Sequence, residues 1–409
     1  MDQVSIFDFI TEDKPLPTDI KLLSLFSGIG AFEKALDRLG INYELVNYCE
    51  IDKYASRSYA AIHNVSEDLN LWDVTKVDEK SLPKDIDLLT YGFPCQDISL
   101  AGKQKGLFND DGSKTRSGLF FDALRIIEAT QPKIAIAENV KPLIGESFKE
   151  QFKLILDSLS DAGYNNYYEV LNAKDFGVPQ NRERVFIVSI RKDVDGGFSF
   201  PNGFPLEKRL KDVLEETVDL KYYLSDKMVD YLATITEKNK ARGNGNVYSP
   251  SDVDGVSKTI TTKEGSRVKD NFIEEPIIHQ EHNNRVLVPF ADESVKPSVA
   301  VNFEREKQQI VNSDKEIYQC ECNSSWQDNK VGLKVSPTLR ANNNNTFAYT
   351  GLRIRKLTPL ECWRLMGFDD ADFHKAKKVN SSTQLYKQAG NSIVVDVLEH
   401  LLAKALKVI

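Results

Sequence analysis

The sequence predicts an α/β fold in which helices cover a mostly parallel sheet, joined to a smaller domain that is irregular and β-rich. Between residues 21 and 190, short apolar runs alternate with longer amphipathic segments, as strands and helices do in a parallel sheet wrapped by helices. After residue 190 this alternation stops, and stretches rich in glycine, proline and asparagine follow. The chain has 409 residues, more than most single domains, so we expect two domains.

The strands and helices of the first domain follow one another along the chain. We predict strands over residues 21–26, 43–50, 86–92, 133–139, 167–172 and 185–190. We predict helices over residues 31–40, 53–63, 119–129 and 148–164, and a last helical segment, 393–409, that packs back on this domain. The predicted organisation is an N-terminal arm (1–20), a first domain (21–194 with 381–409) and a second domain (195–380).

The composition excludes several classes of protein. Apolar residues make up 41% and charged residues 28%, a balance typical of soluble globular proteins. No apolar run reaches the roughly 18–20 residues that a membrane-spanning helix needs, and the acidic N-terminus is unlike a secretion signal. Five cysteines, a small and odd number, argue against a disulfide scaffold, so we expect a reducing cytoplasm.

The charge is unevenly distributed. The formal net charge is −8, which taken alone argues against a nucleic-acid-binding protein. Residues 331–409, however, hold twelve Lys and Arg against six Asp and Glu, a local excess of positive charge. Such a region is either a solvated surface or a face that binds phosphates.

A glycine turn follows the first predicted strand. Gly28 and Gly30 let a ligand approach the backbone closely, and the helix that follows leaves N–H groups free to face it. Glu50 ends the next strand, 22 residues after Gly28, the spacing expected of a carboxylate that binds ribose hydroxyls. Glu33 stands where a dinucleotide fingerprint has its third glycine, so a nucleoside without a pyrophosphate fits better than NAD. The alternative is a tight turn with no ligand.

Three further strand ends carry reactive side chains. Cys95 follows the strand 86–92 and precedes a polar, glycine-containing stretch typical of a lid, so it is either a nucleophile or a buried packing residue. Glu138 ends the strand 133–139 and is either a helix cap or a buried acid with a raised pKa. Arg182 and Arg184 lie on the same face of a predicted strand. They either form a solvated strand edge or bind a carboxylate or phosphate together.

The order of these motifs resembles the DNA cytosine-5 methyltransferase family of prokaryotes and phages. The strings that carry the resemblance cover residues 21–190 and 351–409: FSGIGAFE (26–33), Glu50, Asp73, GFPCQDIS (92–99), ENV (138–140), QNRERVFIV (180–188), RKLTPLECWRLMGF (355–368) and QAGNSIVVDV (388–397). The resemblance implies a Rossmann-like, S-adenosylmethionine-dependent catalytic domain and a smaller target-recognition domain that binds double-stranded DNA.

The resemblance also assigns roles to individual residues. Cys95 matches the nucleophile, Glu138 the acid on the cytosine ring, and Arg182 and Arg184 the active-site arginines. The positions that match S-adenosylmethionine-binding residues are Phe26, Ser27, Gly28, Gly30, Glu50, Ile51, Asp73, Val74, Pro94, Leu119, Asn391 and Ile393. The stretch 100–118 matches a loop that closes over DNA, and the expected DNA contacts are Ser99, Lys103, Gln104, Thr338 and Arg340.

The implied chemistry needs a thiolate and a flipped base but no metal. Addition of the thiolate to carbon 6 of cytosine makes carbon 5 nucleophilic, and a stacked duplex hides both atoms, so the base must leave the helix. Cys320 and Cys322 with His279 and His282 do not have the usual spacing of a zinc site. We therefore expect no metal.

Three alternatives remain at this point. A tRNA cytosine methyltransferase is similar, but that branch has Pro-Pro-Cys at the nucleophile, whereas residues 93–95 are Phe-Pro-Cys. A catalytically idle DNA-binding relative is disfavoured by the intact Cys95, Glu138 and arginine pair. A dehydrogenase is disfavoured by the missing third glycine.

The N-terminal arm carries a separate motif. Gln3 to Phe7 (QVSIF) resembles the short peptide that docks on bacterial replication sliding clamps, although a five-residue match is common by chance. We expect a monomer, because one base flipped at a time requires only one chain. We also expect it in the bacterial cytoplasm, at the nucleoid.

Overall fold

The computed structural model describes residues 15–94, 106–109, 111–279, 281–282, 285–286 and 348–408. The chain divides into two compact units. The first unit is Met1–Leu214, Asp254–Lys263 and Pro359–Ile409, and the second is Glu215–Val253 and Glu264–Thr358. The two units are described separately below.

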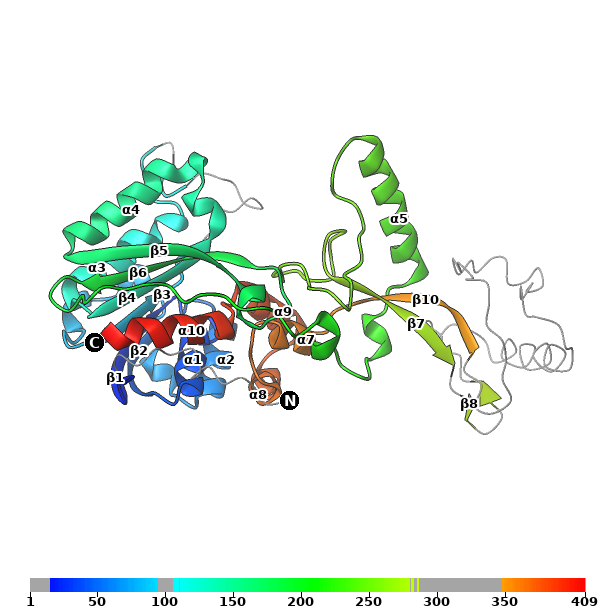
Figure 1. Ribbon diagram of the computed structural model, residues 1–409, viewed down its shortest axis with the longest axis horizontal. Coiled ribbons are helices and arrows are strands. Elements are labelled where there is room, and N and C mark those ends of the chain that lie inside the picture. Colours follow the sequence, from blue (N-terminus) through cyan, green and yellow to red (C-terminus); the bar gives the residue numbers. More distant parts are fainter. Residues whose placement is uncertain are drawn as a thin grey trace, which may run out of the picture. The chain divides into compact units, whose positions relative to one another are not determined.

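The first unit is built on a six-stranded sheet of order β2-β1-β3-β4-β6-β5 (Figure 1). The strands are β1 (Asp19–Leu25), β2 (Asn42–Cys49), β3 (Leu88–Tyr91), β4 (Ile134–Val140), β5 (Tyr164–Asn172) and β6 (Glu183–Arg191). The first four pair in parallel, and β6 is antiparallel to both of its neighbours, β4 and β5. The predicted mostly parallel sheet is confirmed, and each predicted strand lies at its expected place in the chain.

Helices cover both faces of this sheet. They are α1 (Ala31–Arg38), α2 (Lys53–His63), α3 (Phe120–Thr130), α4 (Lys149–Asp161) and α10 (Val395–Ala405). Three further helices, α7 (Pro359–Arg364), α8 (Asp370–Val379) and α9 (Ser382–Asn391), pack against one another, and α8 and α9 also pack against α2. Leu23, Leu25 and Leu89 pack with α3 and α4 in one hydrophobic cluster. The alternate residues Leu22 and Leu88 are equally buried and point to the other face, which carries α1 and α10 (Figure 1).

The C-terminal helix returns to the first helix of the chain, as predicted. Helices α10 and α1 pack against each other, and Arg38 of α1 pairs with Asp396 at 3.3 Å and with Glu399 at 3.4 Å. This contact brings the segment just before α10, residues 391–393, to the end of the sheet where β1 leads into α1. The return of the chain therefore completes one wall of the site described below.

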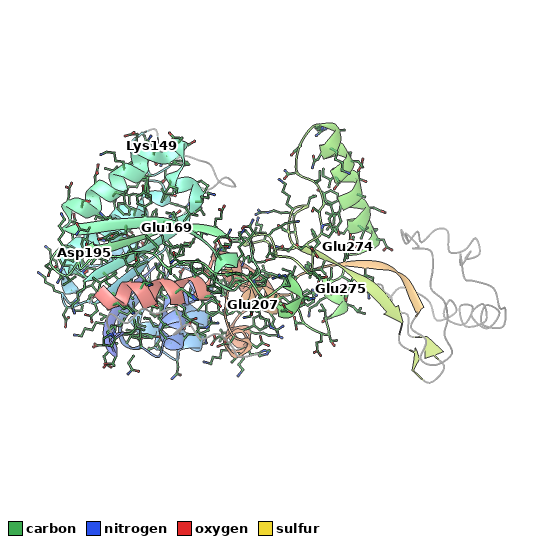
Figure 2. All side chains as sticks on the ribbon, in the orientation of Figure 1. Lys149, Glu169, Asp195, Glu207, Glu274 and Glu275 are labelled. Carbon is green, nitrogen blue, oxygen red and sulfur yellow. The ribbon has the colours of Figure 1, made fainter. Side chains whose placement is uncertain are left out.

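The second unit contains a 16-residue helix and short antiparallel strands in the part that the structure describes. Helix α5 is Asp226–Ala241, β7 (Phe272–His279) pairs with β10 (Ala348–Lys356), and β8 (Glu281–His282) pairs with β9 (Arg285–Val286). The fully buried Arg355 pairs with Glu275 at 2.6 Å, and the Tyr223 hydroxyl donates to the same carboxylate (Glu275 is labelled in Figure 2). This ion pair thus links β10 to β7.

The boundaries of the units differ from those predicted. Residues 195–214, 254–263 and 359–380 fall in the first unit, although the sequence predicts a second domain over 195–380. Residues 254–263 join the first unit because their backbone bonds to a distant segment: Ser257 N–H donates to Pro179 and Asn181 N–H donates to Ser257. Long-range bonds of this kind leave no trace in local composition.

None of the helices in the described residues is long and apolar enough to span a bilayer.

Candidate active site

A small cavity of about 50 Å³ lies at the carboxyl ends of β1, β3 and β4. Its walls come from three places: the turn after β1, the ends of β3 and β4 at Gly92 and Glu138, and the segment before α10. The cavity brings together six residues that the sequence singled out, namely Phe26, Ser27, Gly28, Glu138, Asn391 and Ile393. Strand carboxyl ends are where open α/β sheets bind ligands.

The two glycines of the first turn have different surroundings. Gly28 has φ 58°, and a Cβ added to it would meet no atom within 4 Å. Gly30 has φ 81°, and its Cβ would lie 2.0 Å from Nε2 of His63. Space for a ligand is therefore open at Gly28, whereas at Gly30 the side chain of His63 fills it. Gly30 faces His63 of α2 in this structure, and its predicted contact with the cofactor stays a prediction.

Glu50 links the glycine turn to the end of β2. Its Oε2 accepts the Gly28 N–H at 2.9 Å, and its Oε1 accepts the Asp52 N–H at 2.7 Å. Burial raises the pKa of Glu50 to about 7, against the opposing effect of these two N–H groups. Each carboxylate oxygen has a second acceptor site, so the group is fixed in place and still able to bind hydroxyls.

The remaining predicted cofactor positions divide into exposed and buried ones. Ile51 is 71% exposed beside Glu50. Asp73 caps a short 3-10 turn by accepting the Thr75 N–H and hydroxyl, and these bonds lower the pKa of Asp73. Val74 is buried in the core and Leu119 packs against that core, so a role for these two would involve their backbone or a neighbour. Pro94 is half-buried.

Ser24 and Thr90 are two cavity residues that the sequence analysis missed. Both are buried, and the Thr90 hydroxyl donates to the Ser24 hydroxyl at 3.2 Å on the floor of the cavity. The signal was available in the sequence: Ser24 interrupts the apolar run from Leu22 to Phe26, and Thr90 follows the apolar pair Leu88 and Leu89.

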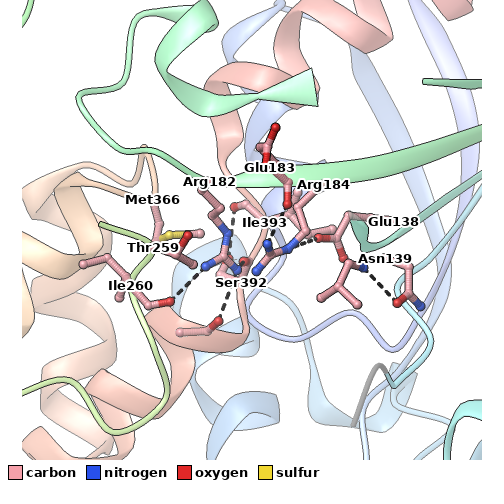
Figure 3. A network of polar contacts seen from close by, with 12 residues as sticks. Glu138, Asn139, Arg182, Glu183, Arg184, Thr259, Ile260, Met366, Ser392 and Ile393 are labelled. Carbon is pink, nitrogen blue, oxygen red and sulfur yellow. Dashed lines mark hydrogen bonds and ion pairs between the residues drawn. The ribbon is translucent and has the colours of Figure 1, made fainter. Parts of the chain in front are cut away.

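Glu138 forms an ion pair with Arg184 at the edge of the cavity. The Arg184 Nε lies 2.9 Å from Glu138 Oε1, and both side chains are largely buried (Figure 3). Burial raises the pKa of Glu138, while Arg184 and Arg182 oppose the rise. A carboxyl group of this kind is suited to general acid catalysis near neutral pH.

Arg182 has a different role from Arg184. Its guanidinium donates to three backbone carbonyls, those of Ile260 at 3.0 Å, Gly390 at 3.1 Å and Ser392 at 2.7 Å (Figure 3). The sequence suggested two equivalent active-site arginines, whereas the structure shows that Arg182 holds residues 254–263 and the segment before α10 together. Arg182 is thus a positioning residue in this arrangement.

The strand end before Cys95 is also held in place. The side-chain amide of Asn139, next to Glu138, donates to the Phe93 carbonyl at 3.0 Å (Asn139 is labelled in Figure 3). This bond ties the end of β4 to the turn after β3. The backbone leading to Cys95 therefore has a fixed position relative to Glu138.

Several predicted residues lie outside the described part of the chain. They are the nucleophile Cys95, the DNA-contact candidates Ser99, Lys103, Gln104, Thr338 and Arg340, the N-terminal motif Gln3–Phe7, and Cys320 and Cys322.

The first unit has a Rossmann-like fold, and its cavity lies between a glycine turn held by the buried Glu50 carboxylate and the buried pair of Glu138 and Arg184. Residues 20–407 match the model of the C-5 cytosine-specific DNA methylase family. The chain therefore belongs to the C-5 cytosine-specific DNA methylases.

Individual relatives agree with this assignment. The orphan methyltransferase M.SPRI of Bacillus phage SPR is 38% identical, over 93% of this chain and 96% of the relative. The type II methyltransferase M2.ScrFI of Lactococcus lactis subsp. cremoris is 30% identical, over 95% of this chain and 99% of the relative. The crystal structure of S. pombe Dnmt2 methyltransferase has the same fold, with a TM-score of 0.56 at 19% identity, over 94% of this chain and 97% of that one.

Proposed function

We propose that this DNA cytosine-5 methyltransferase uses S-adenosylmethionine to methylate a flipped-out cytosine in a specific double-stranded sequence, through a covalent bond to Cys95. The observation that carries this proposal is the single cavity that joins the open glycine turn at Gly28 to the buried Glu138. A methyl donor and a base bound at these two ends would meet inside it.

The residues around the glycine turn fit S-adenosylmethionine. Gly28 leaves open space, Glu50 offers acceptor sites for ribose hydroxyls, and the exposed Ile51 offers an apolar surface for a base. Phe26, Asn391 and Ile393 would line the side that faces Glu138. When bound, the cofactor supplies a methyl group activated by a positively charged sulfur.

The buried carboxylate of Glu50 predicts that cofactor binding depends on pH. Ribose hydroxyls donate to the charged form, and protonation converts one acceptor oxygen into a donor. Because the pKa of Glu50 is about 7, the affinity for S-adenosylhomocysteine should fall as the pH drops below neutral. Titration calorimetry at several pH values measures this. Glu50→Gln should bind weakly and lose the pH dependence, and a flat wild-type profile would contradict the assignment.

Cys95, Glu138 and Arg184 would activate the cytosine ring. The Cys95 thiolate adds to carbon 6, the displaced ring electrons reach nitrogen 3, and protonated Glu138 gives that nitrogen its proton. Carbon 5 is then nucleophilic and accepts the methyl group. Loss of the carbon 5 proton to a base expels Cys95 as a thiolate, and return of the nitrogen 3 proton to Glu138 restores the neutral aromatic ring. Arg184 would hold Glu138 in position and stabilise negative charge on the ring.

DNA recognition would involve both units. A stacked base cannot reach the cavity, so the cytosine must leave the helix, with the loop residues Ser99, Lys103 and Gln104 closing over the DNA. The second unit would read base edges, and Thr338 and Arg340 are the candidates that the sequence offers for contacts there.

Bisulfite sequencing of DNA from an expressing strain tests the proposed function directly. We expect one short sequence to be methylated at a single cytosine, at every occurrence. RNA from the same strain serves as the control for substrate class. Methylation confined to RNA, or no methylation of either, would contradict the proposal.

The segment Gln3–Phe7 supports a separate proposal, docking on a replication sliding clamp. Deletion of residues 2–10 should abolish co-purification with the clamp and leave methylation of naked DNA unchanged, because the motif lies before the first strand. A pull-down with purified clamp measures the first effect. Retention of the deleted variant on the clamp would refute the docking role.

A further inference from the structure

Strand β5 has a free backbone edge. It is the last strand of the six-stranded sheet and pairs there with β6 alone. The Ala173 N–H donates to the Arg182 carbonyl, so in the common register of the two strands the odd-numbered residues of β5 bond to β6. The N–H and C=O groups of Tyr168 and Val170 therefore point away from β6. In the part of the chain that the structure describes, no backbone hydrogen bond engages these outward groups.

A groove of about 440 Å³ lies beside this edge, near the carboxyl end of β5. Residues 169–172 form one wall, and residues 201–205, which follow β6 and return past β5, form the other (Figure 1). The Phe204 N–H donates to the Asp175 carbonyl at 2.9 Å and so joins the two sides. All of these residues belong to the first unit, and none of them lines the cavity beside Glu138. The groove is therefore separate from the candidate active site.

The groove is acidic. Glu169 (labelled in Figure 2) and Asp175 line it, and neither carboxylate forms an ion pair within the described residues. No Lys or Arg is among the residues that line the groove. The rings of Phe176 and Phe204 meet edge to face beside these carboxylates, with their centroids 6.2 Å apart. Carboxylates next to aromatic rings match a Lys or Arg side chain, because the rings receive its alkyl stem and the carboxylates its charge.

The opposite face of β5 is apolar at the same level. Tyr168 lies on the face that carries α4, where its ring packs on Phe152 with the centroids 4.8 Å apart, and its side chain is still 49% exposed. The side chains of a strand added at this edge alternate between the two faces. One set enters the acidic groove, and the other lies beside the exposed ring of Tyr168.

We propose that the free edge of β5 binds an extended segment of another protein, in which basic and apolar residues alternate, as an additional strand. The backbone groups of Tyr168 and Val170 bond to the segment, and Glu169 and Asp175 bind its basic side chains. Exposed strand edges bind other chains in this way unless they are covered. Charge disfavours two other occupants: a second copy brings the same acidic groove, and the N-terminal arm (1–20) holds five acidic residues and one lysine.

Two short labelled peptides test this proposal on the full-length protein. One alternates arginine with valine, and the other has glutamate in place of arginine. Fluorescence anisotropy gives the dissociation constants, and thermal melting verifies that each variant is folded. Val170→Pro removes an outward N–H while leaving the bonds between β5 and β6 intact. Glu169→Lys reverses one charge of the groove, and Glu128→Lys, an equal change at an exposed position of α3, is the matched control.

We expect the arginine peptide to bind and the glutamate peptide not to bind. Val170→Pro and Glu169→Lys should each weaken the arginine peptide about tenfold, and Glu128→Lys should bind it like wild type. Amide hydrogen exchange, followed by NMR with labelled tyrosine, adds a readout of the backbone bonds. Bound peptide should slow exchange at Tyr168 and leave Tyr167 unchanged, because the Tyr167 N–H already bonds to β6.

Three outcomes would overturn the proposal. The first is that the arginine peptide does not bind or binds no better than the glutamate peptide. The second is that it binds without slowing exchange at Tyr168, which places it elsewhere on the surface. The third is that sedimentation shows a dimer of the free protein that Val170→Pro dissociates, in which case the edge is covered by a second copy. If Val170→Pro does not fold, the exchange at Tyr168 and the effect of Glu169→Lys decide.

Discussion

Cys95→Ala is expected to abolish methyl transfer while DNA and cofactor still bind. Without a thiolate, carbon 6 of cytosine is not attacked and carbon 5 does not become nucleophilic. Removal of a covalent nucleophile typically lowers the rate by about 10⁴-fold or more. Transfer of a labelled methyl group to DNA in a single turnover measures the loss, and a gel-shift assay measures the retained DNA binding.

Cys362→Ala is the matched control for this experiment. Cys362 is fully buried in α7, and we expect its loss to lower stability without changing the rate per folded molecule. Cys49 is a poorer control, because its thiol donates a hydrogen bond to the Trp72 carbonyl. Turnover by Cys95→Ala close to that of Cys362→Ala would contradict the covalent mechanism.

Glu138→Gln is expected to lower the rate of methyl transfer by about 10²–10⁴-fold, the usual contribution of a general acid. The amide keeps the size of the carboxyl group and its contact with Arg184 but has no proton to give to the ring. Single-turnover rates in saturating DNA and cofactor isolate this step. Glu169→Gln, on the exposed face of edge strand β5, is the control and should behave like wild type (Figure 2).

The rate of methyl transfer is expected to fall as the pH rises, because Glu138 must be protonated to act as the acid. Burial raises the pKa of Glu138, so its active, protonated form persists closer to neutral pH than that of an ordinary glutamate. The rate of methyl transfer should therefore fall as the pH rises through the pKa of Glu138. In Glu138→Gln the rate should no longer show this decrease. Arg184→Ala should lower the rate of methyl transfer overall. It should also shift the decrease in rate to higher pH, because Arg184 favours the charged form of Glu138. If the rate of Glu138→Gln falls with rising pH as that of wild type does, another group causes the decrease.

The strands and most of the site follow from local sequence. Apolar runs predict β1 to β6 because a central parallel strand is buried on both faces, and helices α1 to α4 have the amphipathic period. Once the strands are placed, their carboxyl ends must meet at one edge of the sheet. This rule brings Gly28, Glu50 and Glu138 to the same edge without any knowledge of their side-chain contacts.

The features that the sequence did not reveal depend on contacts between distant residues. Gly30 and Gly28 look alike in the sequence, and only the position of His63 shows that the space beside Gly30 is filled while the space beside Gly28 is open. Arg182 and Arg184 share one strand face, but the carbonyls that engage Arg182 come from residues 260, 390 and 392. Asn70 binds the backbone of Glu50 and of Trp72 through its side-chain amide, and nothing in the sequence signals these bonds.

Trapping with 5-fluorocytosine measures the central step, the bond between sulfur and carbon 6. DNA with 5-fluorocytosine at the target position should give a protein–DNA adduct that survives denaturing electrophoresis, since fluorine cannot leave as a proton does. Peptide mass spectrometry should locate the adduct at Cys95, with the methyl group already on the base. If full methyl transfer to ordinary DNA occurs while 5-fluorocytosine DNA yields no adduct, or an adduct at another residue, the account of this enzyme is wrong.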